Sequence, residues 1–188
     1  QAGMYHELGH ELCTPPEVFQ RVINIAKGEE KVEGLDAGAQ ILPKIYNVVE
    51  DGRMEREMSN RYAGVAETIA ASCKVFPRWH EQVGEGVSLE NEVVWPLLYT
   101  SLPYFQMRPE VREKMTKRGR ALFEELEPVV HKAVRGTPEE ALEASIHISK
   151  RLQEEGALQV PDAATPPAPP PPGTQPSSPP QQQQPQQQ

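Results

Sequence analysis

The chain has 188 residues and a formal net charge of −8. This acidic balance argues against nucleic-acid binding, which needs a basic face. No apolar run approaches the roughly 20 residues that span a bilayer, so no membrane partner is expected. Two cysteines, Cys13 and Cys73, are too few to cross-link a secreted scaffold of this size. A reducing, cytoplasmic setting is therefore the expectation, on a chain whose native N-terminus we expect to be missing.

Residues 161–188 differ from the rest of the chain in composition. They contain 11 of the 20 prolines and eight glutamines, and they lack Leu, Ile, Val, Phe, Tyr and Trp. Such a segment cannot bury enough apolar surface to offset the entropy lost on ordering. The sequence therefore predicts one helical domain over 1–160 and a disordered Pro/Gln-rich tail over 161–188. Proline runs also suit a protein partner that has an aromatic groove.

The first half of the chain predicts four helices. They are expected over 4–12, 15–26, 43–62 and 63–75, with a polar loop over 27–38. Thr14 is the expected N-cap of the second helix, with Pro15 at its first position. Apolar residues recur on one stripe of that helix, as in an amphipathic helix packed on a core.

The second half is less regular at first. Residues 77–109 predict short helices and loops that cover the core, and 110–134 a long helix with a kink at Pro128. Thr137 and Glu140 form a capping-box pattern, which opens a last helix ending near Gly156. No alternating strand pattern occurs, so the predicted fold class is mainly α.

Residues 6–10 read His-Glu-Leu-Gly-His, an HExxH pattern. On a helix, His6 and His10 share one face, with β-carbons about 5–6 Å apart, so that both imidazoles can bind one Zn²⁺. Glu7 points beside the metal, where it can act as general base on a zinc-bound water. Gly9 would allow another backbone to approach the helix closely. The pattern thus predicts a zinc centre of hydrolytic type.

A catalytic zinc takes three protein ligands and keeps one open position. Position 16 is Pro, where the metzincin pattern would have a third histidine, so that class is excluded. The remaining solution is a carboxylate from a second helix, and we predict Glu50, with Asp51 as the alternative. Arg53, three residues after Glu50, is expected to orient or neutralise that carboxylate.

These two segments resemble a known family. HELGH at 6–10 followed by NVVEDGRME at 47–55 is similar to the zincin-like domain of bacterial and phage proteins, many of which carry a von Willebrand factor A domain. The resemblance implies His6, His10 and Glu50 as zinc ligands and Glu7 as the base. Asp51 and Arg53 match supporting positions. Relative to zincins, we expect the upstream sheet to be missing from this fragment, and a Pro/Gln tail follows where the von Willebrand domain would be expected.

Two functions follow as expectations. The first is a zinc-dependent metallopeptidase of the gluzincin type that hydrolyses a peptide or protein substrate. The second is a non-catalytic adaptor module, held together by the metal, in a larger von Willebrand factor A or ATPase-type assembly. An open fourth position favours the enzyme and a closed site favours the adaptor. The group that would stabilise the oxyanion is left open among Tyr46, Tyr62 and His80.

Other candidate ligands have a simpler interpretation. Cys13 is expected to be a small buried residue. His80 starts a broken HExxH and is expected in a loop. His131 and His147 lie on amphipathic segments and are expected to be ordinary helix residues.

Overall fold

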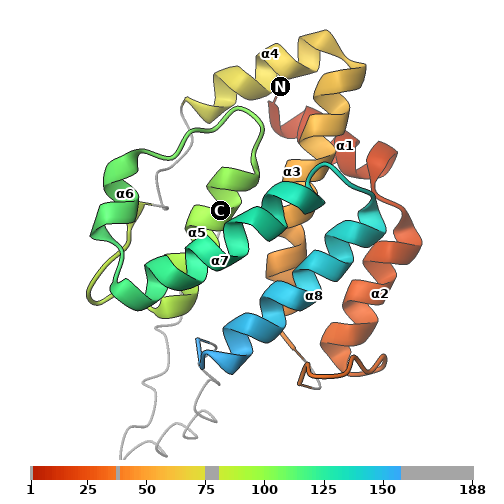
Figure 1. Ribbon diagram of the computed structural model, residues 1–188. Coiled ribbons are helices and arrows are strands. Elements are labelled where there is room, and N and C mark those ends of the chain that lie inside the picture. The colour runs from red at the N-terminus through yellow and green to blue at the C-terminus, as the bar shows by residue number, and fades with distance from the viewer. Residues whose placement is uncertain (1, 37–38, 75–80, 158–188) are drawn as a thin grey trace, which may run out of the picture. The chain divides into compact units, whose positions relative to one another are not determined.

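The computed structural model describes residues 2–36, 39–74 and 81–157. These ranges contain helices and no strand, which confirms the mainly α prediction (Figure 1). The helices are α1 (Ala2–Cys13), α2 (Pro16–Lys27), α3 (Ile41–Arg61), α4 (Ala63–Cys73), α5 (Leu89–Ser101), α6 (Pro109–Lys114), α7 (Lys117–Ala133) and α8 (Pro138–Glu154). All belong to one unit, Gln1–Leu158. None of the helices described has both the length and the apolar character to cross a membrane.

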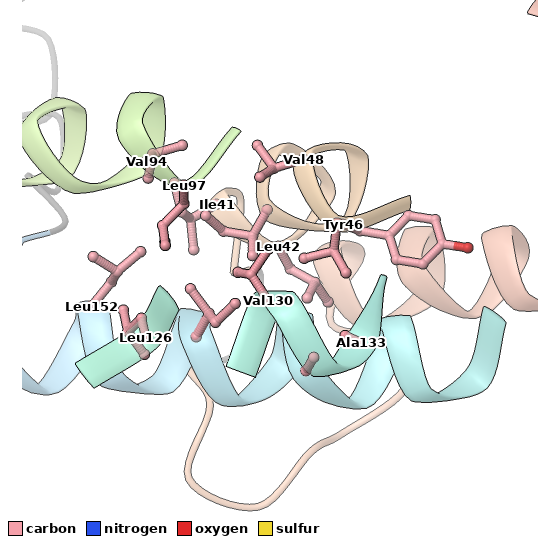
Figure 2. Close-up of a cluster of buried hydrophobic side chains, with 14 of the residues drawn as sticks. Ile41, Leu42, Tyr46, Val48, Val94, Leu97, Leu126, Val130, Ala133 and Leu152 are labelled. Atoms are coloured by element: carbon pink, nitrogen blue, oxygen red, sulfur yellow. The ribbon is translucent and has the colours of Figure 1, made fainter. Parts of the chain in front are cut away.

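Helix α3 is the central element. It contacts α1, α2, α4, α5, α7 and α8 (Figure 1). Its first half is apolar on nearly every side, and Leu42, Ile45 and Val49 are almost fully buried. Figure 2 shows Leu42 among aliphatic side chains contributed by the surrounding helices. Burying one such side chain contributes about 1.5–3 kcal/mol, so this half of α3 anchors the fold.

A second, smaller apolar cluster holds α1 in place. It joins Cys13 of α1 to Met54 and Met58 of α3 and to Val65 and Ile69 of α4. Both methionines are at most 1% exposed. The cluster presses α1 against the second half of α3, which brings the HExxH segment to the NVVEDGRME segment.

The predicted boundaries hold for α1 to α4 within about two residues, but the predicted cap of α2 is wrong. Pro15, not Thr14, is the N-cap residue, and no side chain caps this helix. The Thr14 hydroxyl instead donates to Glu50 at 2.6 Å. A tertiary hydrogen bond to a buried carboxylate has replaced the local cap.

Two further predictions fail in the second half. The region 77–109 was predicted to cover the core with short helices and loops. It instead contributes a 13-residue helix, α5, whose Val93, Val94 and Leu97 lie in the main core. The long helix predicted over 110–134 is interrupted at Met115 and Thr116, where the Thr116 side chain accepts from Gly119 N and caps α7. The capping box of α8 at Thr137 and Glu140 is confirmed.

The predicted tail over 161–188, with its disorder and its suggested partner, lies outside the described residues. So does His80.

Candidate metal centre

The two histidines of HELGH lie one turn apart on α1 and converge. Their ring centroids are 4.9 Å apart, and Nε2 of His6 lies 3.3 Å from Nε2 of His10. Each side chain is 27% exposed, so the pair sits at the edge of the protein with one side open to solvent. The helix predicted for this segment therefore places the imidazoles as expected.

Asp51 of α3 completes the group. Its Oδ1 atom lies 3.2 Å from Nε2 of His10 and 3.6 Å from Nε2 of His6. Asp51 is only 8% exposed, and Oδ1 is buried with no hydrogen-bond partner. An unpaired buried carboxylate oxygen is costly, and such groups normally have a partner or bind a metal. His6, His10 and Asp51 form the one group in the described residues whose ligand atoms are close enough to share a metal ion.

The spacing of these three atoms fits a tetrahedral metal. Bonds of 2.0–2.1 Å to a tetrahedral centre place neighbouring ligand atoms roughly 3.3–3.4 Å apart. The separations observed are 3.2, 3.3 and 3.6 Å. Two imidazole nitrogens and one carboxylate oxygen are also donors that Zn²⁺ accepts. The residues present thus fit a zinc ion.

The tautomer of each histidine follows from its outer partner. Nδ1 of His6 lies 3.1 Å from Glu55 Oε1, and because a carboxylate only accepts, Nδ1 is the donor. Nδ1 of His10 lies 3.3 Å from Thr14 Oγ1. The Thr14 hydroxyl has already donated its proton to Glu50, so it accepts from His10. Both Nε2 atoms therefore present lone pairs toward Asp51, as in metal sites whose outer carboxylates orient histidine ligands.

Glu55 also changes the basicity of His6. Its hydrogen bond raises the pKa of His6 above the ordinary value, against burial, which lowers it. The negative charge of Asp51 raises the pKa further. A more basic imidazole is a better donor to a metal cation, so the carboxylates around His6 favour ligation.

Glu50, the predicted third ligand, does not meet the histidines. It is 1% exposed and is clasped by Arg53, whose Nε and Nη2 donate to its two oxygens at 2.7 and 2.6 Å. Thr14 supplies another donor. The alternative weighed from sequence, Asp51, occupies the position beside His6 and His10. Glu50 instead supports His10 through Thr14.

Arg53 ties the two helices together. Besides Glu50, it donates through Nη2 to the carbonyl oxygen of Cys13 at 2.6 Å, in the last turn of α1. Burial lowers the pKa of Arg53, but the hydrogen bond and charge of Glu50 outweigh burial and raise it overall. The arginine stays charged, and it serves as the expected support for a buried carboxylate.

Close packing sets the distance between α1 and α3. A β-carbon built at Gly9 would lie 2.0 Å from Sδ of Met54. The predicted close approach at Gly9 is thus made by a buried side chain of α3 and not by its backbone. Asn47 adds a local restraint, since its amide donates to Oδ2 of Asp51 at 3.4 Å and leaves Oδ1 facing the histidines.

A cavity of about 470 Å³ opens on the histidine pair. Glu7, Thr14, Phe19 and Tyr46 line it together with both histidines. Glu7 is exposed on this wall. Tyr46 is 3% exposed, and its hydroxyl is buried without a hydrogen-bond partner. Figure 2 shows its ring pointing away from the labelled aliphatic side chains. Burial, with the charge of Glu50, raises the pKa of Tyr46, so the hydroxyl keeps its proton.

The remaining candidates lie apart from the metal group. Cys13 is buried, as predicted, and is a free thiol. His131 lies on α7 and His147 on α8. Tyr62 lies at the junction of α3 and α4 and lines an apolar groove with Tyr5 and Leu8, away from the histidine cavity.

No family model, curated protein or solved structure matches the chain. The resemblance to zincin-like domains therefore stays a prediction from two short motifs.

Sequence reasoning preferred the wrong face of α3, with Asp51 only as the alternative, and it did not identify Glu55. Asn47, Asp51 and Glu55 follow one another at intervals of four residues, so they share the face that meets α1. Glu50, the ligand predicted from the sequence, lies on the neighbouring face, where it accepts hydrogen bonds from Arg53 and Thr14. A signal was present: Arg53 lies three residues from Glu50 and can neutralise it within the helix, whereas Asp51 has no basic residue three or four positions away.

Proposed function

We propose that the chain is a zinc-dependent hydrolase that cleaves peptide bonds, with His6, His10 and Asp51 as the metal ligands. One observation carries the proposal: Nε2, Nε2 and Oδ1 converge at the edge of an open cavity, and Oδ1 has no other partner. Within the described residues, no fourth protein ligand joins this group. Three ligands and an open position are typical of catalytic zinc.

A Zn²⁺ ion at this position would lower the pKa of a bound water to about 7 and polarise a substrate carbonyl. The chain's own residues supply the proton transfers. Glu7 follows His6 in sequence, lies about 100° further around α1 and faces the cavity. We assign it as the general base that accepts the proton of the attacking water and returns it to the leaving amine.

Tyr46 is the group assigned to the developing negative charge. Tyr46 lines the same cavity, and its buried hydroxyl has no hydrogen-bond partner. A substrate oxyanion would accept from this hydroxyl, and a donor already in place needs little reorganisation during the reaction. Of the three candidates considered from sequence, Tyr62 lines a different groove and His80 lies outside the described residues. Cys13 and Cys73, both free thiols, are consistent with a reducing cytoplasmic setting.

The test is a pair of measurements on the same protein. Zinc content and affinity are measured by metal analysis and chelator competition, and hydrolysis by a quenched-fluorescent peptide library. The expected result is stoichiometric zinc and zinc-dependent cleavage. Glu7→Gln should keep the zinc and lower kcat about 10²- to 10⁴-fold, the usual contribution of a general base.

Glu11→Gln is the matched control, because Glu11 lines the same cavity. It should retain both zinc and activity. Zinc binding with no cleavage by the wild type would instead favour the adaptor module. Failure to bind zinc would overturn the metal site altogether.

A further inference from the structure

Arginines in the described residues mostly pair with carboxylates. This holds for Arg21, Arg53, Arg61, Arg108, Arg112, Arg118 and Arg151. Arg56, Arg120 and Arg135 form no such pair within the described ranges, although the chain carries a net charge of −8. Arg120 lies elsewhere and donates to the backbone oxygen of Glu113. Arg56 and Arg135 line one cavity of about 690 Å³, which α3 shares with the loop between α7 and α8.

Arg56 is partly buried and short of acceptors. Its Nη2 reaches the carbonyl oxygen of Ser101 at 3.4 Å, while Nε is buried with no partner. The hydroxyl of Ser59, three residues further along α3, is also buried without a partner. Both residues line the cavity. Unpaired buried donors of this kind are rare and normally mark a missing acceptor.

The charges around Arg56 agree with this geometry. Burial lowers the pKa of Arg56, the positive charge of Arg135 lowers it further, and only Tyr104 opposes them. The one acidic residue that lines the cavity, Glu57, is already held by Arg53 and Arg61. Two like charges thus share a cavity with no carboxylate free to neutralise them.

We propose that this cavity binds the phosphate group of a small phosphorylated molecule. A phosphate at neutral pH carries nearly two negative charges, which match Arg56 and Arg135, and guanidinium groups bind its oxygens through paired hydrogen bonds. Ser59 adds a neutral donor. Tyr104, 40% exposed at the same cavity, offers a ring on which an organic group can stack. The site is independent of the zinc proposal, because it shares none of the proposed ligands.

The test is calorimetric titration with inorganic phosphate and with adenosine monophosphate, in buffers of equal ionic strength. Saturable binding is expected, and it should weaken roughly 10- to 100-fold in Arg56→Gln and in Arg135→Gln, the loss of one charged hydrogen-bonding group. Arg135 is exposed, so its substitution leaves the fold intact. Tighter binding of the nucleotide would identify an organic phosphate as the ligand, and equal binding would identify phosphate alone.

Two controls separate this site from its alternatives. Arg108→Gln alters an exposed arginine outside the cavity and should bind phosphate as the wild type does. Asp51→Asn should also bind it normally, because anion binding through a metal at the histidines would be lost with that ligand. Absence of binding to the wild type, wild-type affinity in both cavity variants, or loss in Asp51→Asn would each overturn the proposal.

Discussion

Oδ1 of Asp51, on α3, lies 3.2 Å from Nε2 of His10, on α1, and is buried without a hydrogen-bond donor. With the His10 proton on Nδ1, two electron-rich atoms face each other across this distance. Such a contact is unfavourable unless a cation lies between them or a histidine takes up a proton. The proposed zinc ion removes the repulsion.

The first prediction separates Asp51 from Glu50. Asp51→Ala should weaken zinc binding by more than about 100-fold, since loss of a ligand should exceed the 10- to 100-fold typical of outer residues. Glu50→Gln should keep most of the affinity, because Glu50 reaches the histidines only through Thr14. Competition with a fluorescent chelator measures both. The opposite ranking of the two variants would restore Glu50 as the ligand.

The second prediction concerns the residues that orient the histidines. Glu55→Gln weakens the hydrogen bond to Nδ1 of His6, and Thr14→Val removes the acceptor for Nδ1 of His10. Each should lower zinc affinity about 10- to 100-fold without changing stoichiometry. Glu67→Gln, a control on α4 outside the metal group and the histidine cavity, should leave the affinity unchanged. Unaltered affinity in both test variants would contradict the outer-shell assignment.

Much of the fold was predictable from local signals. Helix periodicity, the proline at the start of a helix and the capping box at Thr137 act over a few residues, and they placed most helices correctly. The break between α6 and α7 was missed because the Thr116 cap depends on Glu92, whose carboxylate accepts from the Thr116 backbone and hydroxyl. Thr116 alone is a possible N-cap, but its contact with Glu92 on α5 is a tertiary one that the local sequence does not show.

The metal group was predictable only in part, because two of its ligands follow from local spacing and the third depends on packing between helices. His6 and His10 follow from spacing within one helix. The choice between Glu50 and Asp51 depends on how α3 is rotated against α1, and this rotation is set by the packing of Met54 and Met58 with α1 and α4. Neighbouring residues on a helix differ by about 100° in direction, so a motif alone leaves the ligand uncertain by one position.

The third prediction concerns the buried ion pair of Glu50 and Arg53, which are 1% and 4% exposed. Arg53→Met should destabilise the protein by about 3–5 kcal/mol, because it leaves a buried carboxylate without its partner. Changing both residues, with Glu50→Leu, should recover most of that loss. Urea denaturation of the two single variants and the double variant measures the coupling. Additive losses would show that the pair does not act as a unit.

The last prediction concerns close packing around α3. A β-carbon at Gly52 would lie 2.6 Å from the carbonyl oxygen of Ser101, a backbone atom at the end of α5. Gly64, on α4, has no atom within 4 Å of the same position. Replacing a helical glycine by alanine gains up to about 1 kcal/mol in helix propensity, so a net loss of stability in the Gly52 variant would come from the contact.

Gly64→Ala should therefore stabilise the protein by up to about 1 kcal/mol, and Gly52→Ala should destabilise it by about 1–3 kcal/mol through overpacking. Gly9→Ala should fall between them in stability, because the atom it meets belongs to the flexible side chain of Met54. It should nevertheless weaken zinc binding, since Met54 is fully buried and can yield only in part, so that the added β-carbon pushes α1 away from the helix that carries Asp51. Urea denaturation and zinc competition on the three variants give these values. Equal stability of Gly52→Ala and Gly64→Ala would contradict the close approach of α3 and α5, and unchanged zinc affinity in Gly9→Ala would show that the ligand group tolerates movement of α1.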